Sequence, residues 1–229
     1  MGDLHVVSLG LVEYREALAL QHRFADARAA DAIPDTLLLL EHPLCFTKGR
    51  RTRPGELPFP EQWYRERGVD VIDVDRGGFV THHAPGQLVG YPIMRVTSAR
   101  DHVARMERAI VAALTDEGVE ARGRSSEGPS LTGVWVGDRK IASIGVHVSR
   151  GITTHGFAIN VDNDLEPWSW IVPCGMPDVK TTSLALETGR EGPLLPCLRK
   201  RVAWRFAQEC GMRQRLVSPA RALPAAAAV

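Results

Sequence analysis

The fold follows from residues 133–161, GVWVGDRKIASIGVHVSRGITTHGFAINV. Residues 134–136 form one β-prone arm, and residues 141–148 form a second arm with apolar residues at alternate positions. Gly137-Asp138 between them can turn the chain, so the spacing predicts a β-hairpin. A further β-prone run, residues 156–161, comes after a Gly/Thr-rich link. These residues therefore predict three successive strands.

The remaining elements are predicted from periodicity and from helix-ending residues. Residues 36–40 are a continuous apolar run, which is typical of a buried sheet strand. Asp101 is expected to cap a long helix, and residues 119–133 to form a polar crossover loop. We expect strands at 6–11, 36–40, 45–48 and 69–75, with 45–48 continuing the same sheet, and helices at 13–30, 60–67, 101–117 and 196–209. This alternation predicts one α/β domain over residues 1–211, followed by a disordered Ala/Pro/Arg-rich tail at 212–229.

Composition excludes several classes of protein. The chain of 229 residues is 44% hydrophobic and 24% charged, which is typical of a soluble globular protein. Its formal charge of +1 argues against bulk electrostatic binding to nucleic acid or to a membrane. From its first residues we expect no signal peptide, no apolar run reaches membrane-spanning length, and the four cysteines lack metal-finger spacing. We expect reduced thiols, a cytoplasmic location and, since no heptad or unexplained apolar stripe is found, a monomer.

Two reactive side chains lie in and after the hairpin. Lys140 begins the second arm, and Cys174 stands between Pro173 and Gly175. A thiolate near an ammonium group has a lowered pKa and is a nucleophile at neutral pH. The alternatives are a small core cysteine and a solvated lysine. Only four of the 28 basic residues are lysines, so arginine is the default cation here, and a lysine at 140 favours a role that needs deprotonation.

A loop rich in glycine and histidine, residues 76–87, follows the strand at 69–75. Its glycines allow a ligand to approach the backbone closely, and its amides can bind an anion or a carbonyl oxygen. The loop matches neither GxGxxG nor a P-loop. His82, His83 and His155 suggest a metal site, but adjacent residues on an extended chain point to opposite faces. We therefore favour hydrogen bonding around a pocket, or a structural role, for His83 and His155.

Several motifs together resemble one protein family. They are RGGFVTHHAPGQLVGYP at 76–92, RKIASIG at 139–145, THGFAINV at 154–161 and WIVPCG at 170–175, with Thr182-Ser183 soon after. In this order they are similar to the motifs of the lipoyl(octanoyl) transferases. The resemblance extends from about Leu9 through the last helix. It implies the α/β catalytic domain shared with biotin- and lipoate-protein ligases, in which a mixed sheet is flanked by helices.

The resemblance also implies roles for individual residues. Cys174 occupies the position of the acyl-thioester nucleophile, and Lys140 that of the lysine which lowers the pKa of the cysteine. Neither a metal nor a cofactor is implied. Ile144 and Phe157 are candidate walls for the acyl chain. The implied substrate-binding residues are Arg76, Gly77, Gly78, Phe79, Val80, Thr81, His82, His83, Ser143, Ile144, Gly145, Gly156, Phe157 and Ala158.

Three positions depart from the family pattern. His82 stands where an aromatic residue is preferred, Ala84 replaces a glycine, and Trp168 stands where phenylalanine is common. We expect the first two to alter the floor of the acyl site or its preferred chain length. None of the three changes Cys174 or Lys140, so the class of reaction is unaffected.

The implied reaction transfers an octanoyl group between proteins. Its donor is octanoyl-acyl carrier protein, and its acceptors are lysines of the apo lipoyl domains of 2-oxoacid dehydrogenases and of the glycine cleavage H protein. Amide formation from a thioester is downhill, so ATP is not required. Both protein substrates are acidic, and the Arg50-Arg51-Arg53 loop is either a docking patch for them or a solvated loop.

Other functions remain open from the residues alone. An ATP-dependent lipoate or biotin ligase of the same fold needs no cysteine nucleophile. A non-catalytic module that binds acyl groups or lipoyl domains never acquires a covalent acyl group. A cysteine hydrolase releases free octanoate, and it differs from a transferase in whether water reaches the thioester.

Overall fold

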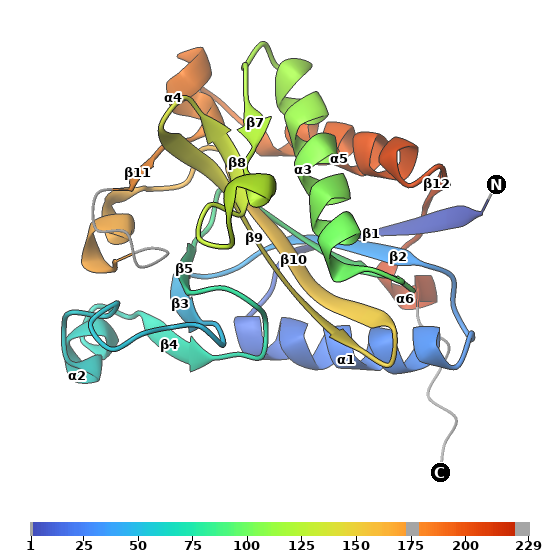
Figure 1. The fold of residues 1–229 in the computed structure, drawn as a ribbon, viewed down its shortest axis with the longest axis horizontal. Coiled ribbons are helices and arrows are strands. Elements are labelled where there is room, and N and C mark those ends of the chain that lie inside the picture. The colour runs from blue at the N-terminus through green and yellow to red at the C-terminus, as the bar shows by residue number, and fades with distance from the viewer. Residues whose placement is uncertain (1, 173–178, 223–229) are drawn as a thin grey trace.

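The computed structural model describes residues 2–172 and 179–222. Its centre is a mixed nine-stranded sheet in the order β12-β1-β2-β6-β10-β9-β8-β7, with β11 also paired to β9 (Figure 1). The strands are β1 (Asp3–Leu11), β2 (Thr36–Glu41), β6 (Gln87–Ile93), β7 (Arg122–Gly123), β8 (Gly133–Val136), β9 (Arg139–Ser149), β10 (Ile152–Asn160), β11 (Lys180–Thr181) and β12 (Arg213–Leu216). Strand β1 is parallel to both its neighbours, whereas β2, β6, β10, β9 and β8 pair antiparallel in turn.

The predicted hairpin is confirmed and lies toward the β7 edge of this sheet. Strands β8 and β9 pair antiparallel around Gly137, with Trp135 opposite Lys140. Strand β10 then returns along β9, so that Gly156 lies opposite Gly145. These pairings place the two glycine-containing motifs side by side.

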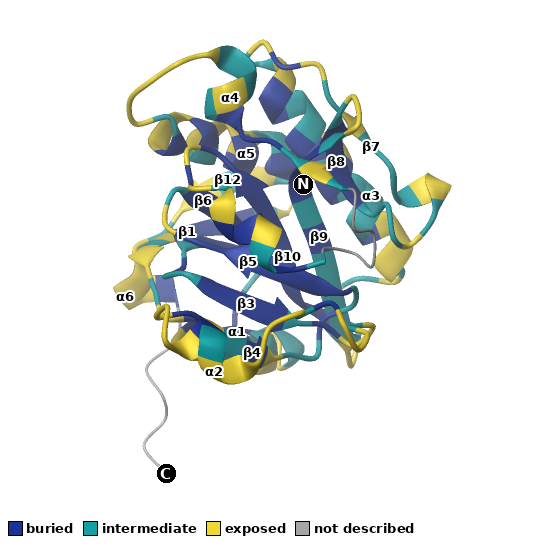
Figure 2. Cartoon of the chain, turned by 90° about the vertical axis from the view of Figure 1, so that its left-hand side faces the viewer, coloured by how far each residue is buried: buried dark blue, intermediate teal, exposed yellow. Residues whose placement is uncertain are grey.

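Helices cover both faces of the large sheet, as predicted. The helices are α1 (Tyr14–Ala29), α2 (Glu61–Arg65), α3 (Ala99–Thr115), α4 (Leu184–Thr188), α5 (Leu195–Glu209) and α6 (Pro219–Ala222), with short 3-10 helices at Ser125–Glu127 and Glu166–Trp170. Ile110 of α3 and Phe206 of α5 belong to the core on one face, while Phe24 of α1 and Ala222 of α6 belong to the core on the other. Buried strands between half-exposed helices are visible in Figure 2.

A second sheet of three strands lies beside the first, in the order β4-β3-β5. Its strands are β3 (Cys45–Lys48), β4 (Asp70–Asp73) and β5 (Val80–His83). The prediction that residues 45–48 continue the main sheet was wrong. Pro43 follows β2 and has no N–H to donate, so the ladder ends and the chain turns into a new sheet. The mixed α/β fold with a helix-flanked sheet is nevertheless the one expected.

The prediction of a disordered tail from residue 212 was also wrong over most of its length. Strand β12 pairs in parallel with β1, and Asp3 forms ion pairs with Arg213 and Arg215. A short edge strand that is mostly exposed carries no apolar alternation, which is why the sequence pattern missed it. Residues 223–229 lie outside the described part of the chain.

Two smaller predictions are corrected at the ends of α3. The side chain of Ser98, not that of Asp101, caps this helix by accepting the backbone N–H of Asp101 at 3.2 Å. The crossover that follows the helix is not entirely a loop, because Arg122–Gly123 forms the short edge strand β7. No helix within residues 2–172 or 179–222 is long and apolar enough to cross a bilayer.

Candidate functional site

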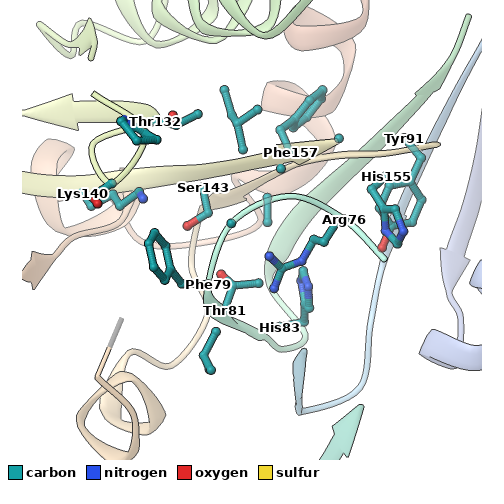
Figure 3. Close-up of a pocket in the computed structure, with 18 of the residues that line it drawn as sticks. Arg76, Phe79, Thr81, His83, Tyr91, Thr132, Lys140, Ser143, His155 and Phe157 are labelled. Carbon is teal, nitrogen blue, oxygen red and sulfur yellow. The ribbon is translucent and has the colours of Figure 1, made fainter. Parts of the chain in front are cut away.

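A cavity lies between strands β9 and β10 of the large sheet and the glycine-containing segment that leads into β5 (Figure 3). The space not filled by protein atoms is about 550 Å³, including solvent at the open mouth. Its lining comes from six separate parts of the chain. The lining residues are Tyr14, Arg76, Gly78, Phe79, Val80, Thr81, His83, Tyr91, Pro129, Ser130, Thr132, Lys140, Ser143, Ile144, Gly145, His155, Gly156, Phe157 and Ala158.

Glycine lets the two walls of the cavity meet. The backbone N–H of Gly77 donates to the carbonyl of Val146 on β9 at 2.9 Å. A Cβ atom added to Gly145 would lie 2.6 Å from the carbonyl oxygen of Gly77, which is too close for any other residue. Gly145 is therefore required for the segment at residues 76–78 to pack directly on the strand that carries Lys140.

Arg76 places a positive charge in the cavity wall. Its side chain is only 7% exposed, and its Nη2 donates to the carbonyl and to the Oγ1 of Thr47, at 2.8 and 2.7 Å. Nη1 donates to the carbonyl of Gly77 at 3.1 Å. The guanidinium thus ties strand β3 to the glycine segment and holds that segment in a fixed conformation.

Lys140 is a buried lysine, 4% exposed, on the inner wall of the cavity. Its Nζ lies 5.4 Å from the centre of the Trp135 ring, within range of a cation–π interaction. The carbonyl of Lys140 accepts the backbone N–H of Thr182 at 3.0 Å, so β11 fixes the strand on its other side. The alternative of a solvated surface lysine does not hold for this residue.

Cys174 lies outside the described residues. On its N-terminal side, the N–H of Val172 donates to the carbonyl of Glu56 at 2.8 Å. On its C-terminal side, Thr181 of β11 pairs with Lys140 of β9. The described chain on the C-terminal side of Cys174 therefore runs next to Lys140.

The inner end of the cavity is made of tyrosine and histidine side chains. Tyr91 Oη lies 2.7 Å from His42 Nε2, and His42 Nδ1 lies 2.7 Å from the carbonyl of Val12. A carbonyl can only accept, and burial lowers the pKa of His42 to about 4, so its neutral ring donates from Nδ1 and accepts at Nε2. The hydroxyl of Tyr91 is therefore the donor to His42.

Tyr14 is held in a similar way at the same end. His155 Nε2 lies 2.7 Å from Asp75 Oδ1, and His155 Nδ1 lies 3.4 Å from the Tyr14 hydroxyl. The hydrogen bond from His155 lowers the pKa of Asp75 to about 2, while burial lowers the pKa of His155. The neutral ring donates to the carboxylate and accepts from Tyr14. Burial raises the pKa of Tyr14 to about 12, so its hydroxyl keeps its proton.

His83 is oriented by a chain of buried amides. Gln87 Nε2 donates to the carbonyl of His82 at 3.1 Å and to Asn160 Oδ1 at 3.0 Å, which leaves its Oε1 to accept His83 Nδ1–H at 2.9 Å. Burial lowers the pKa of His83 well below its usual value, so the ring is neutral. His83 is thus a fixed hydrogen-bonding residue of the cavity, the role that we favoured.

His82 points away from the cavity, as alternation along an extended chain requires. Its ring lies 5.9 Å from that of Phe46 and 5.3 Å from that of Trp168, within the core of the small sheet. Neither His82 nor Ala84 lines the cavity, so neither side chain forms its floor directly, and their effect on chain length stays a prediction. Within the described residues, no group of three or more His, Cys, Asp or Glu side chains could hold a metal ion.

The structure brings most of the predicted residues together. Among those it describes, only Gly77 and His82 are absent from the lining. Sequence reasoning missed Tyr14 and Tyr91, which read as ordinary helix and strand residues, and the mouth residues Pro129, Ser130 and Thr132, which read as an unstructured crossover. Only the tertiary fold shows that these residues share one cavity.

Comparisons with known proteins agree with this geometry. The family model described as lipoyl protein ligase A/B catalytic domain matches residues 13–195. The chain is 48% identical to an octanoyltransferase of Mycobacterium ulcerans over 198 residues, 82% of this chain and 80% of that protein. A crystal structure of lipoate-protein ligase A bound with ATP has a TM-score of 0.73 at 16% identity, covering 95% of this chain and 88% of the other. A biotin protein ligase from Aquifex aeolicus has a TM-score of 0.52 at 11% identity, covering 92% and 70%.

Proposed function

The chain belongs to the octanoyltransferases of the lipoyl protein ligase A/B family, and from this premise we propose that Cys174 carries the octanoyl group as a thioester while Lys140 exchanges protons with the reacting groups. The observation that carries the proposal is the burial of Lys140 in the cavity wall. A lysine with only a surface role would be exposed to solvent. A buried amine next to a thiol is suited to proton transfer because it can lose its proton, which an arginine cannot.

In the first step the Cys174 thiolate attacks the carbonyl carbon of the octanoyl thioester. The bond from that carbon to the donor sulfur breaks, and the Lys140 ammonium gives its proton to the departing thiolate. In the second step the neutral ε-amine of an acceptor lysine attacks the octanoyl-Cys174 thioester. The bond to the Cys174 sulfur breaks, an amide forms, and Lys140 takes the proton that the attacking nitrogen loses. Both residues return to their starting charges.

In general terms, the donor is an acyl thioester and the acceptor is the lysine of a lipoyl domain. We propose octanoyl-acyl carrier protein as the donor, and apo lipoyl domains of 2-oxoacid dehydrogenases and of the glycine cleavage H protein as acceptors. A cytoplasmic location and a monomeric state stay predictions.

An arginine loop at the cavity wall supports an acidic protein partner. The backbone N–H groups of Arg50 and Arg51 donate to the carbonyls of Arg76 and Gly78, at 3.0 and 2.9 Å. The Arg53 guanidinium lies 5.4 Å from the ring centre of Phe79, which lines the cavity. Within the described residues, none of the three exposed arginines forms an ion pair with a carboxylate. Their charges are therefore available to a partner.

The arginine loop can be tested by changing Arg50, Arg51 and Arg53 together to glutamine. We expect the KM for octanoyl-acyl carrier protein to rise at least about tenfold, with weaker dependence on salt, because rim charges steer association. The KM for a small octanoyl thioester should not change. Equal effects on both donors would show that the loop shapes the cavity and does not dock the carrier.

The proposed chemistry is tested by intact mass after incubation with octanoyl-acyl carrier protein in the absence of ATP. We expect an octanoyl increment on the wild type that Cys174→Ala lacks and that an apo lipoyl domain discharges. Lys140→Ala should acquire it slowly, whereas Lys140→Arg should not restore the rate. Octanoylation only with ATP would instead show a ligase, reversible binding without an increment would show a binding module, and free octanoate as the main product would show a hydrolase.

A further inference from the structure

The cavity has an open end and a closed end. Lys140 and Thr132 lie at one end, and Tyr91 and His155 lie at the other (Figure 3). Strand register gives the same arrangement, because His155 pairs with Val146, six residues along β9 from Lys140. At the strand rise of about 3.3 Å per residue, these backbone positions are about 20 Å apart. The side chains of Lys140 and Tyr91 line the cavity at its two ends, so the length left for an acyl chain is shorter than this separation. An acyl chain bound with its carbonyl beside Lys140 therefore points its methyl end toward the tyrosines.

The closed end differs from the mouth in burial and in order. Tyr14 and Tyr91 are 2% and 3% exposed, whereas Pro129 at the mouth is an exposed residue. Each tyrosine hydroxyl is bonded to a histidine that is itself bonded to a fixed acceptor, the carbonyl of Val12 or the carboxylate of Asp75. The rings are therefore held from behind and do not swing aside easily for a longer chain.

We propose that the rings of Tyr14 and Tyr91 close the acyl cavity and set the length of the chain that this enzyme transfers. The inference rests on the proposed function, since it takes the cavity as the acyl site. Tyr14 is the less tightly held residue of the pair and is therefore the one to substitute. It is the first residue of α1, and its hydroxyl lies 3.4 Å from His155, a longer contact than the 2.7 Å between Tyr91 and His42.

A fixed end wall discriminates against acyl chains that are shorter and against those that are longer than the cavity. Each buried methylene contributes about a fourfold gain in binding, so a chain that stops short of the tyrosines loses that factor for every missing carbon. A chain that is too long must displace a buried ring whose hydroxyl would lose its histidine partner. The preferred chain is thus the longest one that ends at the rings.

The test compares Tyr14→Leu with Tyr14→Phe and the wild type, using an equimolar mixture of hexanoyl-, octanoyl-, decanoyl- and dodecanoyl-acyl carrier protein. Intact mass gives the ratio of adducts on each protein. We expect the ratio of decanoyl to octanoyl adduct to rise about tenfold or more in Tyr14→Leu, since two further methylenes become buried. Tyr14→Phe keeps the ring and should keep the ratio of the wild type.

A second measurement needs no variant and therefore does not depend on the folding of Tyr14→Leu. In a crystal structure of the wild-type octanoyl adduct, the terminal methyl should lie within about 4.5 Å of the Tyr14 or Tyr91 ring. A methyl group elsewhere, or an unchanged ratio in a folded Tyr14→Leu protein, overturns the end-wall proposal while leaving the transferase intact. A wild type that acquires no acyl group at all overturns the proposed function and this inference together.

Discussion

On the large sheet the cavity wall is made of backbone packed against backbone, whereas on the small sheet it is backed by rings packed against rings. Gly156 of β10 lies against the backbone of Gly90 on the neighbouring strand β6, and Gly145 lies against that of Gly77. Behind the small sheet, the ring of Phe46 lies 5.6 Å from that of Tyr64 and 5.9 Å from that of His82.

The two walls differ in the amino-acid substitutions that they tolerate. Backbone in the middle of a sheet cannot shift without breaking its ladder, so an added methyl group on the large sheet has no space. Rings of similar size can replace one another when the total volume is kept. We therefore expect the large sheet to hold the reacting groups rigidly and the small sheet to accept variation, and the following predictions test this contrast.

The largest effect is expected from Gly156→Ala. The new Cβ would collide with the carbonyl oxygen of Gly90 and lie 2.6 Å from Cδ of Pro92. Neither backbone nor proline ring can yield, so the free energy of unfolding should fall by about 3 kcal/mol in urea titrations. Gly2→Ala is the control, since its nearest neighbour is the flexible end of Met212 at 3.6 Å. Equal stability of the two variants would contradict the rigid-wall interpretation.

Glu107→Gln should have the next largest effect. The carboxylate of Glu107 on α3 accepts the N–H groups of Ser125 at 2.9 Å and Gly133 at 3.0 Å, and it also accepts the Ser125 hydroxyl. Loss of its charge should lower the free energy of unfolding by about 2 kcal/mol, since hydrogen bonds to charged groups are the stronger ones. Faster hydrogen exchange at both amides would locate the change at the cavity mouth. The exposed Glu120→Gln is the matched control and should show neither effect.

On the small sheet, His82→Phe should change the dependence of stability on pH. Burial lowers the pKa of His82 to about 4, below the value of about 6.5 in an unfolded chain. Between these values only the unfolded state binds the proton, so stability falls as the pH falls from 6.5 to 4. The phenylalanine should reduce this slope by about 1.4 kcal/mol per pH unit, with little effect at pH 7.5.

Urea unfolding at pH 7.5, 6 and 5 measures the slope for His82→Phe and the wild type. Trp168→Phe is the matched control, because it changes the same ring cluster without removing a titrating group. An unchanged slope in His82→Phe would show that folding does not lower the pKa of His82. Loss of folding in His82→Phe would contradict the tolerance that we ascribe to this sheet.

The smallest effect is expected at the surface of α2, which covers the small sheet. Arg65 and Glu61 form an ion pair at 3.2 Å, but their side chains are 67% and 72% exposed. Glu61→Gln should lower the free energy of unfolding by less than about 0.5 kcal/mol, a difference that salt removes. A larger fall in the free energy of unfolding, measured by urea titration, would show that the ion pair of α2 stabilises the ring cluster more than its exposure indicates.

The large-sheet wall was the part that could be predicted from sequence. The hairpin around Gly137 and the apolar run at 36–40 have strong local patterns, and most residues of the motifs at 76–83, 139–145 and 156–158 line one cavity, while their part in binding substrate stays a prediction. Strand β3 was assigned to the wrong sheet, because a four-residue run does not indicate its partner. Tyr14 and Tyr91 were missed because their place in the cavity depends on contacts between distant parts of the chain. The role of Cys174 stays a prediction.

The parallel pairing of β1 with β12 has a consequence for how the protein is made. These are the first and last described strands, and residues 12–212 lie between them. At about 5–20 residues per second, a ribosome needs on the order of 10–40 s to make that interval. Throughout that time the outer edge of β1 offers unpaired N–H and C=O groups to any neighbouring chain. This edge of the nascent protein is thus covered only by β12, the last of the described strands to emerge.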